Sequence, residues 1–255
     1  MNTVKEIYDK LCELAPPELQ LAYDNAGFLI GRAGSRVKRA LLALDVTSEA
    51  VDEAISCGAQ LIISHHPVIW DALKSLTDET PEREKLLRLI ENRIAVISMH
   101  TNLDIAEGGV NDVLLCLLGA KNEGSFEAEG CGRMGRLDKA VPLTDFLAIC
   151  REKLATRGLR YYDAGRPAER IAVLGGAGGS NLFDAWRAGC DTYVTADVKY
   201  SVFLQARELG INLIDGDHFC TENPVMSALA DRLRAAFPDT EFLVSARHDQ
   251  TARFY

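Results

Sequence analysis

Short apolar runs alternate with amphipathic segments along the first 120 residues of the chain. Three of the runs are apolar at nearly every position, which is typical of strands buried on both faces. They are RALLALDV (39–46), QLIIS (60–64) and RIAVISM (93–99). Before, between and after these runs, apolar residues recur at helical spacing, in the segment before Pro16 and at 48–56, 81–92 and 109–119. Strict alternation of this kind predicts a parallel sheet covered by helices on both faces.

Capping residues mark where several of these helices begin and end. Thr3 and Glu6 have the spacing of a capping box, and Thr47 precedes the segment SEAVDEAIS. Gly58 follows that segment, as expected for a helix that ends in a left-handed residue. Pro81 suits the first turn of its helix.

The second half of the chain predicts another α/β region. Residues 120–140 are glycine-rich and polar, which indicates a domain boundary. Strands or helices are then expected at 142–155, 159–163, 170–174, 181–189 and 191–197. The first pattern resumes with a helix at 199–209 and the strand NLID (212–215), followed by a helix and the strand EFLVSA. We therefore predict an α/β fold with mixed or parallel sheets flanked by helices. The resumption of the first pattern indicates a discontinuous domain, 1–125 plus 200–255, and a smaller α/β domain at 126–199.

Composition narrows the class of protein. The chain is 47% hydrophobic and 25% charged, as in ordinary globular proteins, and its net charge of −9 argues against nucleic acid as the main partner. Seven cysteines without a CxxC pair indicate buried thiols in a reducing compartment. No signal-peptide core and no apolar run long enough to span a membrane is present, so a cytoplasmic protein is expected.

Two of only five histidines, His65 and His66, stand side by side after an apolar strand. Successive side chains of an extended segment point in opposite directions, so one ion is awkward for both. Two neighbouring ions, each bound by one imidazole, are a more natural use. The alternative is that one histidine makes a local hydrogen bond and the other faces solvent.

Similar residues follow other predicted strands. His100 and Asp104 in MHTNLD come after the strand 93–99, and His218 and Glu222 in DGDHFCTEN come after NLID. On a helix, His218 and Glu222 would share one face. The alternatives are a turn or cap role for Asp104, an ordinary polar residue near a cap for His218, and electrostatic stabilisation of a helix N-terminus by Glu222. His100 is a candidate ligand, a proton shuttle or a satisfied polar group.

Together these residues favour a metal site. Ligands of α/β proteins bind beyond the carboxyl ends of parallel strands, and four histidines and two carboxylates fall there. Imidazole with carboxylate suits zinc, manganese, iron or a similar divalent ion.

Other features of the sequence indicate a function less specifically. GGAGG (175–179) is either an anion-binding turn or a close-packed turn between strand and helix. Asp24, Asn25 and Asp45 either orient ligands or form turns. His248 is expected at the surface. No GxSxG nucleophile elbow is present.

The chain resembles the NGG-one-interacting-factor-three-like family, whose members are often described as GTP cyclohydrolase I type 2 homologs. The resemblance spans nearly the whole chain, which is similar to the shorter members of the family. It rests on DNAGFLIG, LALDVT, LIISHHPVIW, SMHTNLD, GVND, VTADVKY and DGDHFCTE.

The resemblance implies a dinuclear metal site, two α/β domains with the second inserted, and a homohexameric ring with the ions facing a cavity. His65 and His66 would each bind an ion, Asp104 and His218 would be further ligands, and Glu222 would bridge. His100 would stand beside the ions for proton transfer or substrate contact. Two departures are Ala196, where the family usually has glycine, and Asp217, where glycine usually precedes the ligand histidine.

Two functions are therefore expected. The first is a metal-dependent hydrolase of a small molecule, with a nucleotide as candidate substrate and GTP ring opening as one version. The second is a non-catalytic metal-binding ring that binds a metabolite or a protein partner.

Overall fold

The computed structural model describes all 255 residues and divides them into two compact units. The first unit comprises Met1–Ala106 and Met226–Asp249, and the second comprises Glu107–Val225 and Gln250–Tyr255. Each unit contains its own central sheet. The predicted α/β class with helix-flanked sheets is confirmed.

The sheet of the first unit has the strand order β13-β4-β5-β6-β2. Its strands are β13 (Glu241–Val244), β4 (Arg39–Ala43), β5 (Leu61–Ser64), β6 (Ala95–Ser98) and β2 (Gly27–Ile30). The first four run parallel, and β2 pairs antiparallel with β6. The strands that the apolar runs predicted thus form the parallel part of this sheet. A short antiparallel pair, β1 (Asn2–Thr3) and β3 (Arg36–Val37), stands apart from it.

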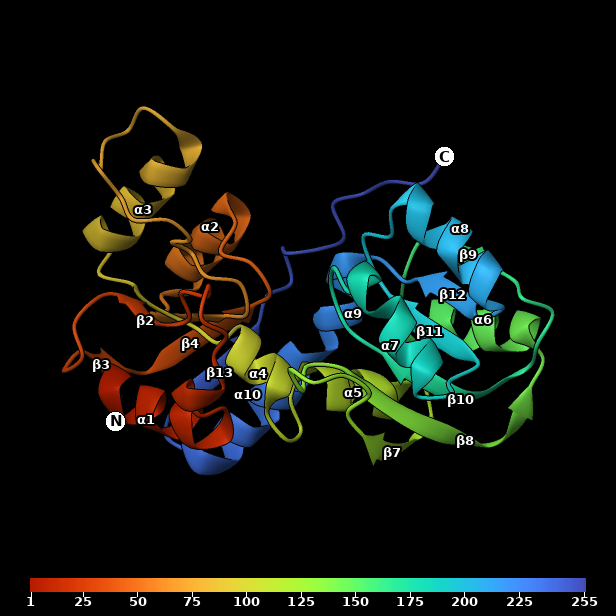
Figure 1. Ribbon diagram of the computed structural model, residues 1–255. Coiled ribbons are helices and arrows are strands. Elements are labelled where there is room, and N and C mark those ends of the chain that lie inside the picture. Colours follow the sequence, from red (N-terminus) through yellow and green to blue (C-terminus); the bar gives the residue numbers. More distant parts are fainter. The chain divides into compact units, whose positions relative to one another are not determined.

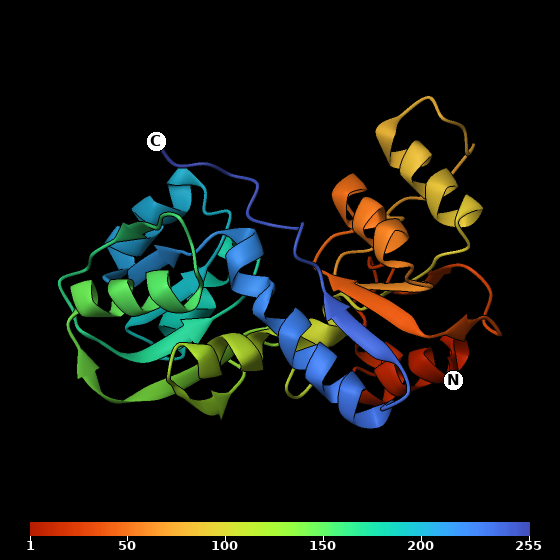
Figure 2. The same cartoon turned by 180° about the vertical axis from the view of Figure 1, so that it is seen from behind.

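Helices cover both faces of this sheet. Two of them, α2 and α3, lie on one face, and α1 and α10 lie on the other (Figures 1 and 2). The helices are α1 (Val4–Leu14), α2 (Ser48–Cys57), α3 (Pro81–Glu91), α4 (Thr101–Ile105) and α10 (Pro224–Ala236), with the 3-10 turn η1 (Pro17–Leu19). Apolar residues of α2 and α3 pack on Leu41, Ile62 and Val96 of the sheet.

The predicted caps are present. The Thr3 side chain accepts from the Glu6 amide while the Glu6 carboxylate accepts from the Thr3 amide, which completes a capping box. Thr47 caps α2, and Gly58 ends it in the left-handed conformation.

The second unit has a six-stranded sheet in the order β7-β8-β10-β11-β12-β9. Its strands are β7 (Lys121–Gly124), β8 (Arg133–Val141), β9 (Arg160–Tyr162), β10 (Ala168–Val173), β11 (Thr192–Thr195) and β12 (Asn212–Asp215). Only β10, β11 and β12 are parallel, and they form the centre. The helices are α5 (Val110–Leu117), α6 (Leu143–Lys153), α7 (Leu182–Arg187), α8 (Tyr200–Leu209) and α9 (His218–Glu222), with η2 (Gly179–Asn181). Separate clusters of buried apolar residues join α5 and α6 to one face and α7 and α8 to the other.

Two expectations about the second half of the chain differ from the structure. Residues 120–140, expected as a domain boundary, include β7 and part of β8. Because every residue of β7 is exposed, that edge strand carries the polar residues that indicated a boundary. Residues 107–125, 200–225 and 250–255, expected in the first domain, belong to the second unit. The range 200–225 does so because β12 pairs with β11 and β9. That one domain is inserted into the other stays a prediction.

None of the seven cysteines forms a disulfide. The predicted burial holds for Cys150, Cys190 and Cys220 and is wrong for Cys116, which is exposed on α5; the remaining three are half-buried. None of the helices has both the length and the apolar character that a membrane span requires.

Candidate metal centre

The pairing of β5 with β6 brings the first histidines together. Ser64 and Ser98, the last residues of these strands, are register partners, and their hydroxyl oxygens lie 2.8 Å apart. The Met99 amide extends the ladder by donating to the Ser64 carbonyl at 2.8 Å. Because β5 and β6 end at paired residues, His65 and His66 lie beside His100 at the same edge of the sheet.

The three imidazole rings form one cluster within the first unit. Their centroids lie 4.9 Å apart for His65 and His66, 5.1 Å for His65 and His100, and 5.5 Å for His66 and His100. One nitrogen of each ring lies within 4.8 Å of the others. His65 is completely buried.

Each of these rings has its Nδ1 atom held by a hydrogen bond. The pairs are His65 with the Met99 carbonyl at 2.8 Å, His66 with Asp45 Oδ1 at 2.7 Å, and His100 with Asp24 Oδ1 at 2.8 Å. An imidazole that donates from Nδ1 keeps its lone pair on Nε2, which is how metal-ligating histidines are usually oriented. Asp24 and Asp45 therefore orient histidines; their alternative role as simple turn residues is not what the structure shows.

Both carboxylates are held in the charged form. Burial would raise the pKa of Asp24, but hydrogen bonds from His100 and Thr101 outweigh it and lower the pKa to about 2. Burial opposes ionisation of Asp45 in the same way, and hydrogen bonds with His248 and His66 lower its pKa overall. An anionic partner favours a proton on the Nδ1 atom that it accepts from.

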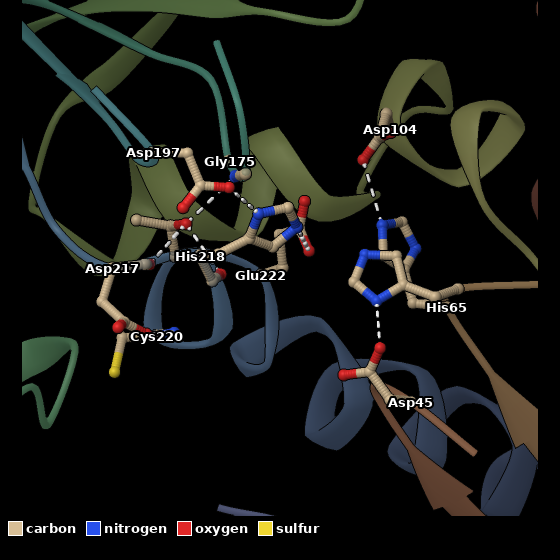
Figure 3. A network of polar contacts seen from close by, with 12 residues as sticks. Asp45, His65, Asp104, Gly175, Asp197, Asp217, His218, Cys220 and Glu222 are labelled. Atoms are coloured by element: carbon tan, nitrogen blue, oxygen red, sulfur yellow. Dashed lines mark hydrogen bonds and ion pairs between the residues drawn. The ribbon is translucent and has the colours of Figure 1, made fainter. Parts of the chain in front are cut away.

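Asp104 completes the cluster of the first unit. It lies on α4, the short helix for which His100 is the N-terminal cap position. Its Oδ1 atom is 3.6 Å from Nε2 of His65 (Figure 3). His100 and Asp104 therefore come from one short segment after β6, and each lies close to the His65 ring.

The second cluster lies at the carboxyl ends of β10, β11 and β12. The Ala196 amide donates to the Gly176 carbonyl and the Gly216 amide donates to the Thr195 carbonyl, both at 2.8 Å. These bonds extend the ladder past the strand ends and bring three loops side by side. The third loop leads to His218 on α9.

His218 repeats the arrangement of the first cluster. Its Nδ1 is 2.7 Å from Asp197 Oδ2, and its Nε2 is 3.1 Å from Glu222 Oε2 (Figure 3). The Glu222 side chain is 6% exposed. The predicted shared helix face is confirmed, and Asp197 is an orienting residue for which the sequence held no specific signal.

Asp217, which stands where a glycine was expected, has φ 74°. This left-handed conformation suits glycine, although aspartate tolerates positive φ better than most residues. The Asp217 carboxylate accepts from the Cys220 amide at 3.2 Å and so caps α9. Its side chain therefore has a local structural role at the start of the helix that carries His218 and Glu222.

The glycine turn 175–179 is close-packed. Three of its amides donate to protein side chains: Gly175 to Asn111, Gly176 to Thr221 and Gly178 to Thr195. These amides are already used, so the turn does not offer them to an anion. The packed-turn alternative is the one that the structure supports.

Gly176→Ala is expected to lower the free energy of unfolding by about 2 to 4 kcal/mol. A Cβ atom there would lie 2.2 Å from Glu222 Oε1, and φ is +67°, so overpacking adds to the cost of a left-handed alanine. Gly179→Ala is the matched control: its Cβ would meet only Val202, at 3.6 Å, and a change within about 0.5 kcal/mol is expected. Urea unfolding of both variants measures the difference. Equal effects would contradict the close approach of Gly176 to Glu222.

Asp24→Asn is expected to reduce stability at neutral pH by about 1 to 2 kcal/mol, allowing for solvent screening. The folded-state pKa of Asp24, about 2, lies below its ordinary value of 3.8, so the folded state binds fewer protons. The contribution is thus fully present above about pH 4 and is lost as the pH falls toward 2. Unfolding free energies of both proteins, measured at several pH values, should converge over this window. A difference that stays constant would show that ionised Asp24 is not its source.

His248 is not the surface residue that the sequence suggested. Its side chain is 7% exposed, and Nε2 lies 3.2 Å from Asp45 Oδ2. The sequence near the C-terminus gave no sign of this contact, because the partner is about 200 residues away. Asn25 holds the loop after His66 by donating to the Ile69 carbonyl at 2.7 Å.

The donor sets of both clusters fit divalent metal ions. The first unit brings together His65, His66, His100 and Asp104, and the second brings together His218 and Glu222. Imidazole nitrogens oriented by a second hydrogen-bonding partner, combined with carboxylates, are typical of zinc, manganese and iron sites.

Comparisons with known proteins cover the whole chain. A family model described as Duf34/NIF3 (NGG1p interacting factor 3) matches residues 2–251. A Clostridium perfringens protein named GTP cyclohydrolase 1 type 2 homolog is 32% identical over 250 residues, 95% of each chain. A Lactococcus lactis protein of the same name is 32% identical over 256 residues, 97% of this chain and 96% of that one.

Solved structures also match this chain over its full length. A Bacillus cereus protein related to NIF3 has a TM-score of 0.95 at 24% identity, covering 100% of this chain and 99% of that one. A Staphylococcus aureus hypothetical protein has a TM-score of 0.92 at 28% identity, covering 99% of both chains. The fold is therefore shared over the full length.

Proposed function

The chain belongs to the Duf34/NIF3 family, and we propose that it is a hydrolase that uses two divalent metal ions to act on a small molecule. One observation carries the proposal: the Nδ1 atoms of His65, His66, His100 and His218 all have a hydrogen-bond partner. A set of histidines that all present Nε2 is the arrangement expected of metal ligands. Four histidines that served only as hydrogen-bonded polar residues would not be expected to share this orientation.

The family resemblance supports a particular assignment of ligands. His65, His66, Asp104 and His218 would hold the ions, zinc, iron, manganese or similar, and Glu222 would bridge them. Such ions act as Lewis acids, which make water more acidic and polarise a substrate oxygen.

His100 is our candidate for proton transfer. Its side chain is 16% exposed, so it retains some access to solvent beside the histidine cluster. Asp24 accepts from its Nδ1 at 2.8 Å and would stabilise the imidazolium that forms when Nε2 takes up a proton. The pair therefore suits a base that receives a proton from water or an acid that returns one to a leaving group.

A planar aromatic ring in the substrate is supported by Trp70. Its indole is 50% exposed, and its ring stands nearly perpendicular to that of His100, at 79° and a centroid distance of 5.6 Å. Exposed tryptophan offers a face on which a nucleobase can stack. Several relatives are named GTP cyclohydrolase 1 type 2 homolog, so a nucleotide is our first candidate.

Quenching of Trp70 fluorescence should report this stacking. The chain has two tryptophans, so in the Trp186→Phe variant Trp70 is the only one left. Guanosine or GTP is expected to quench that variant's emission and not that of Trp70→Phe, while ribose 5-phosphate should quench neither. Trp70→Ala is expected to raise Kd for GTP by about 5- to 150-fold, since stacking contributes about 1 to 3 kcal/mol per base. Equal quenching of both tryptophans would contradict stacking at Trp70.

A turnover screen tests the proposal as a whole. Metal-loaded protein would be assayed against nucleotides, cyclic and phosphorylated compounds, with His66→Ala and Glu222→Ala as variants. We expect turnover that collapses in both variants while the oligomer persists, a homohexamer if the family resemblance holds. If the metal-loaded protein turns over no compound in the panel, the second function, a non-catalytic ring that binds a metabolite or protein, is favoured instead.

A further inference from the structure

The segment Ser245–His248 follows β13 and is anchored to α2 through Glu53. The Glu53 carboxylate accepts from the Ser245 hydroxyl, from the Ala246 amide at 3.0 Å and from the Arg247 amide at 3.2 Å. The His248 amide donates back to the Ser245 hydroxyl at 3.1 Å. Three consecutive residues near the C-terminus are thus held to a helix that lies about 190 residues earlier in the chain, and His248 is held through Ser245.

This anchoring places the His248 ring against Asp45. The Asp45 amide points to His248 Nδ1 at 3.5 Å, which makes Nδ1 the acceptor and leaves the proton on Nε2. Nε2 lies 3.2 Å from Asp45 Oδ2 and donates to it. The same carboxylate accepts from His66 Nδ1 through Oδ1, at 2.7 Å. Asp45 therefore stands between two imidazoles and uses one oxygen for each.

We infer that His248 is a positioning residue for the metal ligand His66 and acts through Asp45. A carboxylate bound at one oxygen can still rotate about its Cβ–Cγ bond, and Asp45 is 41% exposed, so packing alone does not hold it. The second bond, to a ring that is 7% exposed on an anchored segment, fixes the plane of the carboxylate. The fixed plane then sets the direction in which His66 presents Nε2.

The inference rests on the proposed function, because it assigns His66 to a metal. A residue that orients a ligand in this way usually changes metal affinity by about 10- to 100-fold. A purely structural role for His248, in contrast, would lower the stability of the fold and leave the affinity of the folded protein unchanged.

The test compares His248→Ala, His248→Gln and Arg247→Ala in the full-length protein. Glutamine places its amide nitrogen close to the position of histidine Nε2 and can donate to Asp45, whereas alanine cannot. Arg247 is the matched control, since it is exposed and its hydrogen bond to Glu53 comes from the backbone amide, which alanine keeps; its side chain interacts with Glu53 only through its charge. The readouts are the Kd for Zn²⁺, the visible absorption spectrum with Co²⁺ and the melting temperature.

We expect His248→Ala to weaken Zn²⁺ binding by 10- to 100-fold and to change the Co²⁺ spectrum. His248→Gln should return the affinity to within about threefold of the wild type, and Arg247→Ala should match the wild type. If His248→Ala does not fold, His248→Asn replaces it, because its side chain is one methylene shorter than glutamine and places no donor at the position of Nε2, which contacts the Asp45 carboxylate.

Three results would overturn the inference. Wild-type affinity and spectrum in His248→Ala would remove only the positioning role and leave the proposed function intact. Failure of His248→Gln to recover binding would do the same. A wild-type protein that binds no Zn²⁺ or Co²⁺ would overturn both the inference and the metal-dependent function.

Discussion

Replacing His66 with alanine is expected to reduce the affinity for divalent metal by at least about 100-fold, beyond the effect of losing an orienting partner. His66 offers Nε2 from a ring that Asp45 holds at 2.7 Å, and alanine removes the ligand atom altogether. Glu222→Ala should have a comparable effect, because Glu222 is the proposed bridging ligand and its side chain is buried beside His218.

The metal content of the purified proteins measures the loss of metal binding in both variants. Wild-type protein purified without chelator should contain close to two ions per chain by elemental analysis, and each variant should contain clearly fewer. Glu208→Ala is a suitable control, since this exposed carboxylate lies on the surface of α8. Substoichiometric metal in the wild type that added divalent ions do not restore would contradict a dinuclear site. If only His66→Ala lost metal, the proposed role of Glu222 as a metal ligand would be wrong.

His100→Ala is expected to lower kcat by about 10²- to 10⁴-fold while metal content stays at the wild-type level. The reason is that a positioned general acid or base typically contributes a rate factor of this size. Asp24→Asn should reproduce part of the loss, because the anion at 2.8 Å stabilises the protonated imidazole.

Parallel measurements of kcat and metal content separate the roles of His100 that the sequence left open. Loss of metal in His100→Ala would make it a ligand, which its place within 4.8 Å of the other two imidazole nitrogens permits geometrically. Unchanged kcat and unchanged metal would leave it a satisfied polar residue.

Local features of the fold were predictable from the sequence because their causes are local. The capping box of Thr3 and Glu6 and the left-handed Gly58 depend on contacts within a few residues, and both are present as expected. The continuous apolar runs identified β4, β5 and β6, since burial on both faces of a parallel sheet leaves no room for polar alternation. Edge strands do not follow this rule, which is why the polar sequence of the exposed β7 indicated part of a domain boundary.

The candidate site was predictable in its members but not in its contacts. Histidines and carboxylates after apolar strands indicate a site, because the carboxyl ends of parallel strands meet at one edge. Which acceptor holds each ring did not follow, since Asp24 lies 76 residues from His100 and Asp45 lies 21 residues from His66.

By itself, the sequence determined the α/β class, the helix caps, the strands that histidines follow and the types of donor atom. The tertiary structure decided which sheet β12 joins, that Asp24, Asp45 and Asp197 orient the histidines, and that His248 is buried against Asp45. The physical reason is the range of the interactions. Periodicity and capping act within one or two turns, whereas strand pairing and hydrogen bonds to a ring join residues whose separation along the chain carries no pattern.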